Sequence, residues 1–236
     1  MILHSRVVYT TYFGEMELSI IEKLRREIEA REFEYWMLLF FWLLEEDVSE
    51  HDDIEEIDRE EYYETVYWRY RDWVEEWLLF VAANDETLKE KVSQAEIDKE
   101  TANDELIRDH VSDYLKELDP QIRAKAKEIV DATFDHADDA YYTSEERASV
   151  IAANETNFIG NYRQLQVAKE QGRTLKKWVT MKDRKVRRTH ELVDDKVIGI
   201  DEYFTVGRAK MLYPLDQSLG NHPEETVNCR CVVEYI

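Results

Sequence analysis

The chain has 236 residues, 44% of them hydrophobic and 36% charged, with only 6 Gly and 3 Pro. This hydrophobic content excludes a chain that is disordered throughout, and the scarcity of Gly and Pro favours long helices over a turn-rich β sandwich. The formal net charge is −22, and residues 1–120 carry almost all of it, because 34 acidic and 13 basic residues leave −21 there. An N-terminal half this acidic repels phosphate groups, which argues against a protein that coats DNA and favours protein partners.

The first 120 residues are predicted to form an acidic helical region that is rich in aromatic residues. A short strand or arm at residues 1–14 precedes four helices, which we expect at residues 15–46, 59–83, 86–100 and 103–117. Pro120 ends the last of these helices, since the residue before a proline is pushed out of the helical conformation. Five of the six tryptophans precede residue 80, so the second helix builds an aromatic core, a surface that docks on another subunit, or both.

The sequence has no feature that is typical of a membrane or secreted protein. Its most hydrophobic window, residues 35–44, is too short to span a bilayer, and the N-terminus does not resemble a signal peptide. We therefore expect no membrane partner and a protein made in a reducing cytoplasm.

Residues 121–172 are expected to contain two helices that lead into the C-terminal part of the chain. The first covers residues 121–137. The second begins at a capping box, Thr143-Ser144-Glu145-Glu146, in which a hydroxyl side chain is followed three residues later by a glutamate. It ends near Gln171, where Gly172 can adopt the left-handed conformation of a C-terminal cap.

From residue 173 onward the hydrophobic pattern changes to that of short strands. We expect these strands at Trp178–Met181, Val197–Ile200, Met211–Tyr213 and Cys229–Ile236, with one short helix near Thr189 and His190. The predicted fold class is α+β, with long N-terminal helices followed by a small, mostly antiparallel β unit. The expected regions are residues 1–120, 121–172 and 173–236.

The two cysteines, Cys229 and Cys231, are candidate zinc ligands together with His190 and His222. A single intervening residue is fewer than the two to four that usually separate zinc-binding cysteines, and it also suits a mutual disulfide poorly. The alternative is that both cysteines are small buried hydrophobic residues on a terminal strand. We expect no cofactor, with zinc as the exception to test.

A catalytic role can be considered for Arg187 and His190, which are three residues apart and would share one face of a helical turn. Glu191 or Asp183 could complete an acid–base set for phosphodiester or ribosyl chemistry. The sequence has no glycine-rich phosphate loop and no nucleophile elbow. We therefore expect no enzymatic activity.

A structural role accounts for the same residues without a substrate. Asp183, Arg187 and His190 would form a polar network that fixes the loops of the β unit. Asn228 and Arg230 would bond nearby, with Arg230 reaching an aspartate as a bidentate donor. The candidate acceptors are Asp183, Asp194 and Asp216. The expected core residues are Trp178, Phe204 and Pro214.

Residues 163–188 form a local basic segment, with ten Lys or Arg against two acidic residues and a net charge of +8. The segment is interpreted as a solvated basic face or a complement to the acidic half. The two alternatives are that this segment contacts DNA or that it contacts an acidic protein.

The ordered set of motifs in the C-terminal quarter resembles the phage Mu F-like, or phage head morphogenesis, family. The motifs are Trp178 after a lysine pair, Asp183-x-x-x-Arg187-x-x-His190, Phe204, Pro214-x-Asp216 and Asn228-Cys229-Arg230-Cys231. One departure is Asp195, which stands where the family has a glycine in the turn after the histidine. That turn must therefore avoid or tolerate a positive φ.

The resemblance implies a minor capsid protein of a phage or prophage that acts in procapsid assembly. It implies contacts with the portal protein and with the major capsid or scaffold protein, a place in the capsid interior of the virion, and assembly in the host cytoplasm. It also implies that Glu155 and Asn157 lie against the C-terminal unit and help to hold it. The alternatives are a small nuclease- or transferase-like enzyme that uses Arg187 and His190, and a zinc-stabilised nucleic-acid-binding domain.

Overall fold

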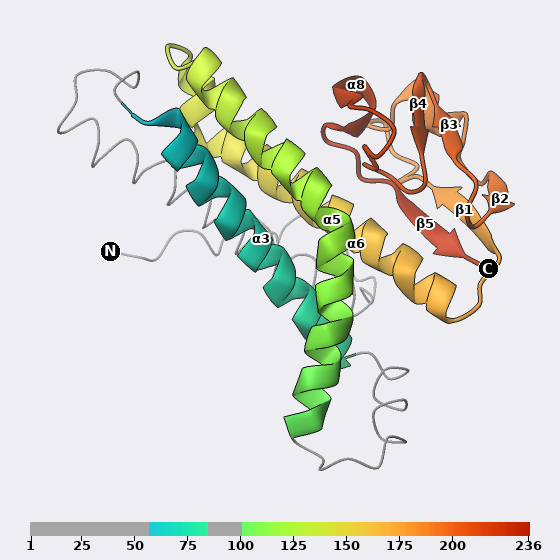
Figure 1. Cartoon of the computed structure of the whole chain (residues 1–236). Coiled ribbons are helices and arrows are strands. Elements are labelled where there is room, and N and C mark those ends of the chain that lie inside the picture. Colours follow the sequence, from blue (N-terminus) through green and yellow to red (C-terminus); the bar gives the residue numbers. More distant parts are fainter. Residues whose placement is uncertain (1–56, 85–100) are drawn as a thin grey trace, which may run out of the picture.

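The computed structural model describes residues 57–84 and 101–236, which form long helices followed by a small β unit (Figure 1). The helical part contains α3 (Arg59–Asn84), α5 (Thr101–Asp135), the short 3₁₀ helix η3 (Ala140–Thr143) and α6 (Glu145–Glu170). The predicted α+β class is confirmed. The expected elements at residues 1–14, 15–46 and 86–100 lie outside the described residues.

Helices α3 and α5 lie side by side in opposite directions and make the most extensive contact between described elements (Figure 1). The side of α3 that faces α5 is apolar at helical spacing, so its burial removes one continuous stripe from water. The residues at the centre of this contact are all less than 5% exposed: Val66, Tyr70, Val74, Leu78, Val111, Leu115, Leu118 and Ile122.

Helix α5 runs without a break through Pro120, so the prediction that a helix ends there is wrong. A proline inside a helix costs about 3 kcal/mol, because it removes a hydrogen bond and crowds the preceding turn. Leu118 and Ile122, on either side of it, are both fully buried, and each such side chain contributes about 1.5–3 kcal/mol. Packing therefore offsets the local cost, and the helix bends about half-way along its length (Figure 1).

Helix α6 begins and ends close to the predicted residues. Its N-cap is Ser144, whose side chain accepts a hydrogen bond from the Arg147 backbone N–H at 3.2 Å, whereas Thr143 belongs to η3. The third residue after this N-cap is Arg147, so the predicted capping box of Thr143 and Glu146 does not form. At the other end Gly172 has φ 69°, and the N–H of Arg173 donates to the Ala168 carbonyl, which completes a left-handed cap.

The C-terminal unit contains a three-stranded antiparallel sheet in the order β2-β1-β5 (Figure 1). These strands are β1 (Leu175–Val179), β2 (Val197–Gly199) and β5 (Val232–Tyr235). A separate antiparallel pair is formed by β3 (Phe204–Val206) and β4 (Ala209–Met211), and two short helices are α7 (Arg188–Glu191) and α8 (Pro223–Thr226). Strand β3 and helix α8 were not predicted.

Two turns of this unit bear on the predictions made from the sequence. Asp195 has φ 59°, so the turn tolerates a positive φ where the resemblance implies glycine. The expected strand at residues 211–213 ends at Met211, because the Leu212 N–H turns aside to donate to the Asp216 carboxylate at 2.8 Å.

Within the part of the chain that the structure describes, no helix is long and apolar enough to cross a membrane.

Candidate functional site

His190 and the two cysteines come together in the interior of the C-terminal unit. His190 lies on α7 and is 1% exposed, while Cys229 and Cys231 lie just before β5 and are each 4% exposed. The His190 Nδ1 atom is 3.4 Å from the Cys231 Sγ atom and 3.6 Å from the Cys229 Sγ atom. Among the described residues, these three side chains have ligand atoms close enough together to hold a metal ion. His222, the fourth candidate, lies elsewhere and contacts Glu224.

Glu225, on α8, holds the opposite side of the His190 ring. Its Oε2 atom is 3.2 Å from His190 Nε2 and accepts a hydrogen bond from the Thr189 hydroxyl at 2.6 Å. A Cβ atom on Gly207 would lie 2.0 Å from the Glu225 Oε1 atom, and Gly207 also has φ 59°. Both facts favour glycine at this position. Sequence reasoning missed Glu225, because only the fold brings residue 225 to residue 190.

The contact between the two thiols shifts their pKa values in opposite directions. The hydrogen bond from Cys231, with a further contribution from His190, lowers the pKa of Cys229 below its ordinary value. The same contact with Cys229 and the burial of the side chain raise the pKa of Cys231. One thiolate is therefore favoured beside the imidazole, and a second thiolate is disfavoured unless a cation compensates its charge.

Helix α6 fixes the backbone that carries the cysteines. The Asn157 side-chain amide donates to the carbonyl oxygens of Cys229 and Cys231 at 2.8 and 3.3 Å. Asn157 thus lies against the C-terminal unit, as the resemblance implies. Glu155 differs, because its carboxylate accepts from the Tyr70 hydroxyl at 2.5 Å and lies 3.8 Å from Lys125, so its bonds tie α6 to the other helices.

Asp183, Arg187 and Arg230 form a second polar group near the cysteine segment. Arg230 donates to Asp183 at 2.8 Å, which is one of its three candidate acceptors, and this bond lowers the pKa of Asp183. Arg187 donates to the Val227 carbonyl oxygen. The other two candidate acceptors serve loops instead: Asp194 accepts from the Thr180 N–H, and Asp216 accepts from the N–H groups of Leu212 and Ser218.

The aromatic residues of the motifs form the core beneath this group. Trp178 and Phe204 are fully buried with ring centroids 5.1 Å apart in an edge arrangement, and the Trp178 ring also lies 5.8 Å from that of His190. Pro214 is buried nearby, whereas Asn228 is exposed and has φ 58°, a conformation that asparagine tolerates.

Lys176 is a buried residue of this core that sequence reasoning missed. Its side chain is 0% exposed, and its ammonium donates to the carbonyl oxygens of Ile200 and Leu212 at 2.7 and 2.9 Å. Burial lowers its pKa to about 8. The signal was available, since residues 176 and 178 lie on the same face of a strand and Trp178 was already assigned to the core.

A family model described as phage Mu protein F like protein matches residues 112–234, which is 123 of the 236 residues. The chain belongs to the phage Mu protein F-like family. The match begins within α5 and includes α6 and most of the C-terminal unit. Membership of this family supports the interpretation of the chain as a phage head morphogenesis protein.

One curated relative is the NAD(+)–arginine ADP-ribosyltransferase EFV of Enterococcus faecalis (strain ATCC 700802 / V583). It is 32% identical over 94 residues, which cover 39% of this chain and 19% of that protein. The chain thus spans about a fifth of the length of this relative. No solved structure matches the chain.

Most basic residues of segment 163–188 of this phage Mu protein F-like chain are engaged within the protein. Arg163 and Lys176 are buried. Several others form ion pairs at 2.5–3.2 Å: Lys169 with Asp201, Lys177 with Glu234, Lys182 with Asp195, and Arg188 with Glu191. The pairs lie over different parts of the C-terminal unit. Contact between this segment and DNA stays a prediction.

Proposed function

We propose that this protein is a minor capsid protein that acts in phage procapsid assembly by binding the portal protein and the major capsid or scaffold protein. Family membership over residues 112–234 is the observation that carries the proposal. The proposal places the protein in the capsid interior of the virion after assembly in the host cytoplasm. It acts by placement and binding, and it needs no substrate.

The surface that fits such partners is an acidic stripe on α3, defined by Glu61, Glu64, Asp72 and Glu76 around Trp68. These residues follow one another at spacings of three and four, which places them on one face of the helix. All are exposed, and Trp68 is 49% exposed with its Nε1 atom donating to Glu64 at 2.9 Å. An exposed tryptophan within acidic residues suits a basic partner surface, where tryptophan commonly anchors the interface.

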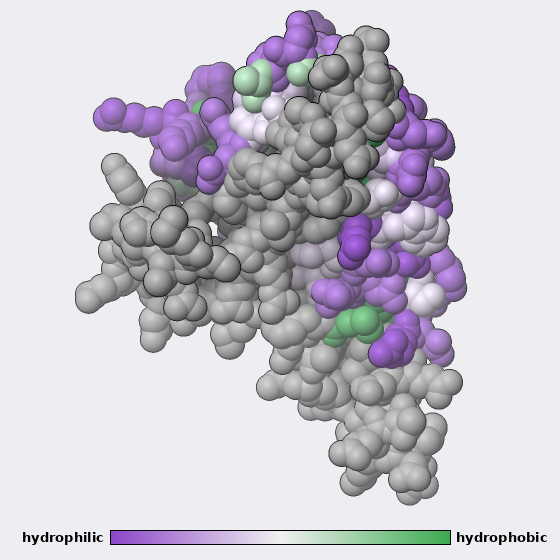
Figure 2. All heavy atoms as spheres, turned by 90° about the vertical axis from the view of Figure 1, so that its left-hand side faces the viewer, coloured by the Kyte–Doolittle hydropathy of each residue, from purple (hydrophilic) through white to green (hydrophobic). Residues whose placement is uncertain are grey.

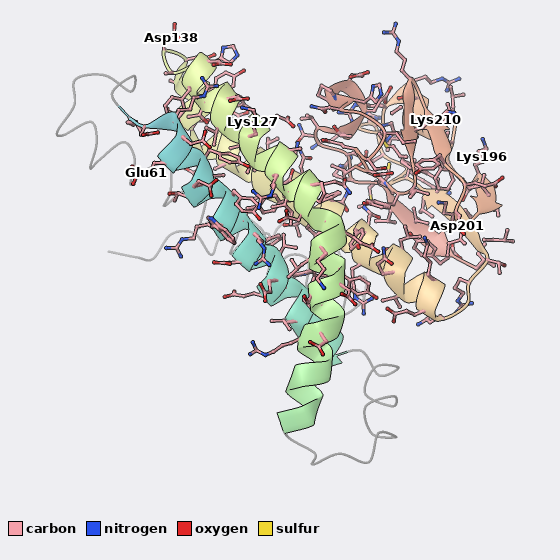
Figure 3. The ribbon with its side chains drawn as sticks, in the orientation of Figure 1. Glu61, Lys127, Asp138, Lys196, Asp201 and Lys210 are labelled. Carbon is pink, nitrogen blue, oxygen red and sulfur yellow. The ribbon has the colours of Figure 1, made fainter. Side chains whose placement is uncertain are left out.

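The position of the stripe leaves the C-terminal unit free for a separate contact. Glu61 lies on α3, whereas Lys196, Asp201 and Lys210 lie on the C-terminal unit on the other side of the molecule (Figure 3). From the side of α3, the visible described atoms are mostly hydrophilic (Figure 2). A charged surface of this kind favours association that depends on salt concentration.

The geometry of Arg187 and His190 favours binding over catalysis. Both ring nitrogens of His190 face protein side chains, and the ring is 1% exposed, so it has no open side for a substrate. The Arg187 guanidinium is bonded to a backbone carbonyl. The transferase activity in the name of the relative belongs to that protein, and incubation of this chain with NAD⁺ and an arginine-rich acceptor should give no labelled product.

The experiment is co-purification of the tagged full chain from cells in which the phage is induced, with quantification of portal, scaffold and major capsid proteins by mass spectrometry. Trp68→Ala should reduce the recovered portal or capsid protein by at least about 10-fold, as expected for an aromatic anchor. Tyr141→Ala is the matched control, because Tyr141 is 40% exposed but lies on η3 outside the stripe. Equal recovery with both variants would contradict the assignment of this surface.

A further inference from the structure

The cluster of His190, Cys229 and Cys231 has a geometry that packing alone does not require. The Nδ1 atom and the two Sγ atoms all lie within 4.8 Å of one another, and all three residues are buried. We propose that these three side chains bind one zinc ion, with a water molecule as the fourth ligand. This inference is independent of the head-assembly function.

The interatomic distances agree with a tetrahedral zinc site. Zinc lies about 2.3 Å from thiolate sulfur and about 2.0–2.1 Å from imidazole nitrogen. Tetrahedral angles then place the nitrogen and each sulfur about 3.6 Å apart. The observed Nδ1–Sγ distances are 3.4 and 3.6 Å. The ion would sit between the three atoms after small side-chain movements.

Glu225 supplies the outer support that zinc-bound histidines usually have. A zinc-bound imidazole commonly donates its other N–H to a carboxylate, which fixes the tautomer and the ring orientation. Here His190 Nε2 faces Glu225 Oε2 at 3.2 Å, so Nδ1 is left as the lone-pair donor toward the sulfurs. The Thr189 hydroxyl and the close approach of Gly207 hold that carboxylate in place.

The short spacing of the cysteines is compatible with the site. In an extended segment, residues i and i+2 project from the same side, which is poor for a mutual disulfide but directs both sulfurs at a third ligand. Cys229 and Cys231 lie between the turn at Asn228 and β5, where both are buried and Arg230 between them is less so, and Asn157 binds both of their carbonyl oxygens. The single residue between the two cysteines is therefore compatible with both of them binding one zinc ion.

A bound zinc ion would connect α7 to the segment before β5, which are about forty residues apart in sequence. The C-terminal unit has few strands and a small core, and units of this kind often depend on a metal or disulfide. Since zinc-binding energy is available only to the folded unit, metal removal should lower its stability.

The test measures zinc in the full chain, purified under reducing conditions without chelator, by inductively coupled plasma mass spectrometry. We expect one zinc per chain. Removal with a chelator should lower the melting temperature, and zinc but not magnesium should restore it. Cobalt added to the stripped protein should give the near-ultraviolet charge-transfer band of thiolate–cobalt bonds.

Substitutions separate ligands from neighbours. His190→Ala and Cys229→Ser should lose the zinc, His190→Cys should retain it, and His222→Ala should behave as the unsubstituted protein. Glu225→Gln should weaken zinc binding by about 10–100-fold. Glu224→Gln is the matched control and should leave zinc binding unchanged, because the Glu224 carboxylate contacts His222 and not His190.

The proposal is overturned if the unsubstituted protein contains no zinc and its melting temperature does not respond to added zinc. It is equally overturned if His190→Ala and Cys229→Ser retain one zinc per chain. The chelation experiment needs no substitution, so it decides the question even if a variant does not fold.

Discussion

Lys176 makes the stability of this protein depend on pH in the alkaline range. Its ammonium is buried, and its pKa is lowered from 10.5 to about 8. Between these values the unfolded chain binds more protons at this residue than the folded chain. The free energy of unfolding therefore rises with pH across this window. Below about pH 8 Lys176 is charged in both states, and the full cost of burying its charge then lowers the stability of the folded protein.

The magnitude follows from the two pKa values. Between about pH 7 and about pH 10, the difference corresponds to about 1–2.5 kcal/mol, the lower value allowing for solvent screening at the end of the side chain. Lys176→Met removes the titrating group and keeps most of the apolar length. The free energy of unfolding of the unsubstituted protein, measured relative to this variant, should therefore increase by that amount over the range.

The assay is urea unfolding, followed by tryptophan fluorescence, at several values of pH. Lys196→Met is the control, because Lys196 is exposed on the same unit and its loss removes a surface lysine only. If the difference between the unsubstituted protein and Lys176→Met stays constant with pH while both remain folded, the reasoning about Lys176 is refuted.

Two further predictions concern the support of the cysteine segment. Asn157→Ala should lower the free energy of unfolding by about 1–3 kcal/mol, because the buried Cys229 carbonyl oxygen loses this donor and the Cys231 carbonyl oxygen keeps only the longer bond from Asn161. Asn221→Ala, at an exposed position, should have little effect in the same denaturation assay. Gly207→Ala should lower the melting temperature strongly, because the new methyl group meets Glu225 at a positive φ. Gly160→Ala, in α6 with open space around it, should instead stabilise by about 0.5–1 kcal/mol, and a similar response of both glycines would contradict this account.

The elements that the sequence predicted well are those with strong local signals. Helix α6 begins at a hydroxyl cap and ends at Gly172, and strands β1 and β5 follow alternating burial. Pro120 misled the prediction because a local preference of about 3 kcal/mol was weighed without the packing of its neighbours. Strand β3 was missed although a signal was present, since the apolar Phe204 and Val206 lie on either side of the polar Thr205.

The site was predicted only as far as its motifs reach. His190, Cys229 and Cys231 were named from sequence, and the structure brings them together. Glu225 could not be found, because its contact with His190 depends on where the fold places α8 relative to α7. Lys176 could have been found, since its position two residues before Trp178 places it on the buried face of β1.

The central claim is that this member of the phage Mu protein F-like family is a component of the phage head. The most direct test is quantitative mass spectrometry of purified procapsids and heads, made with and without the gene for this protein. The account predicts that the protein is present at low copy number in the particles and that head assembly is impaired without it. Absence of the protein from purified heads, together with normal head formation when it is deleted, would contradict the account.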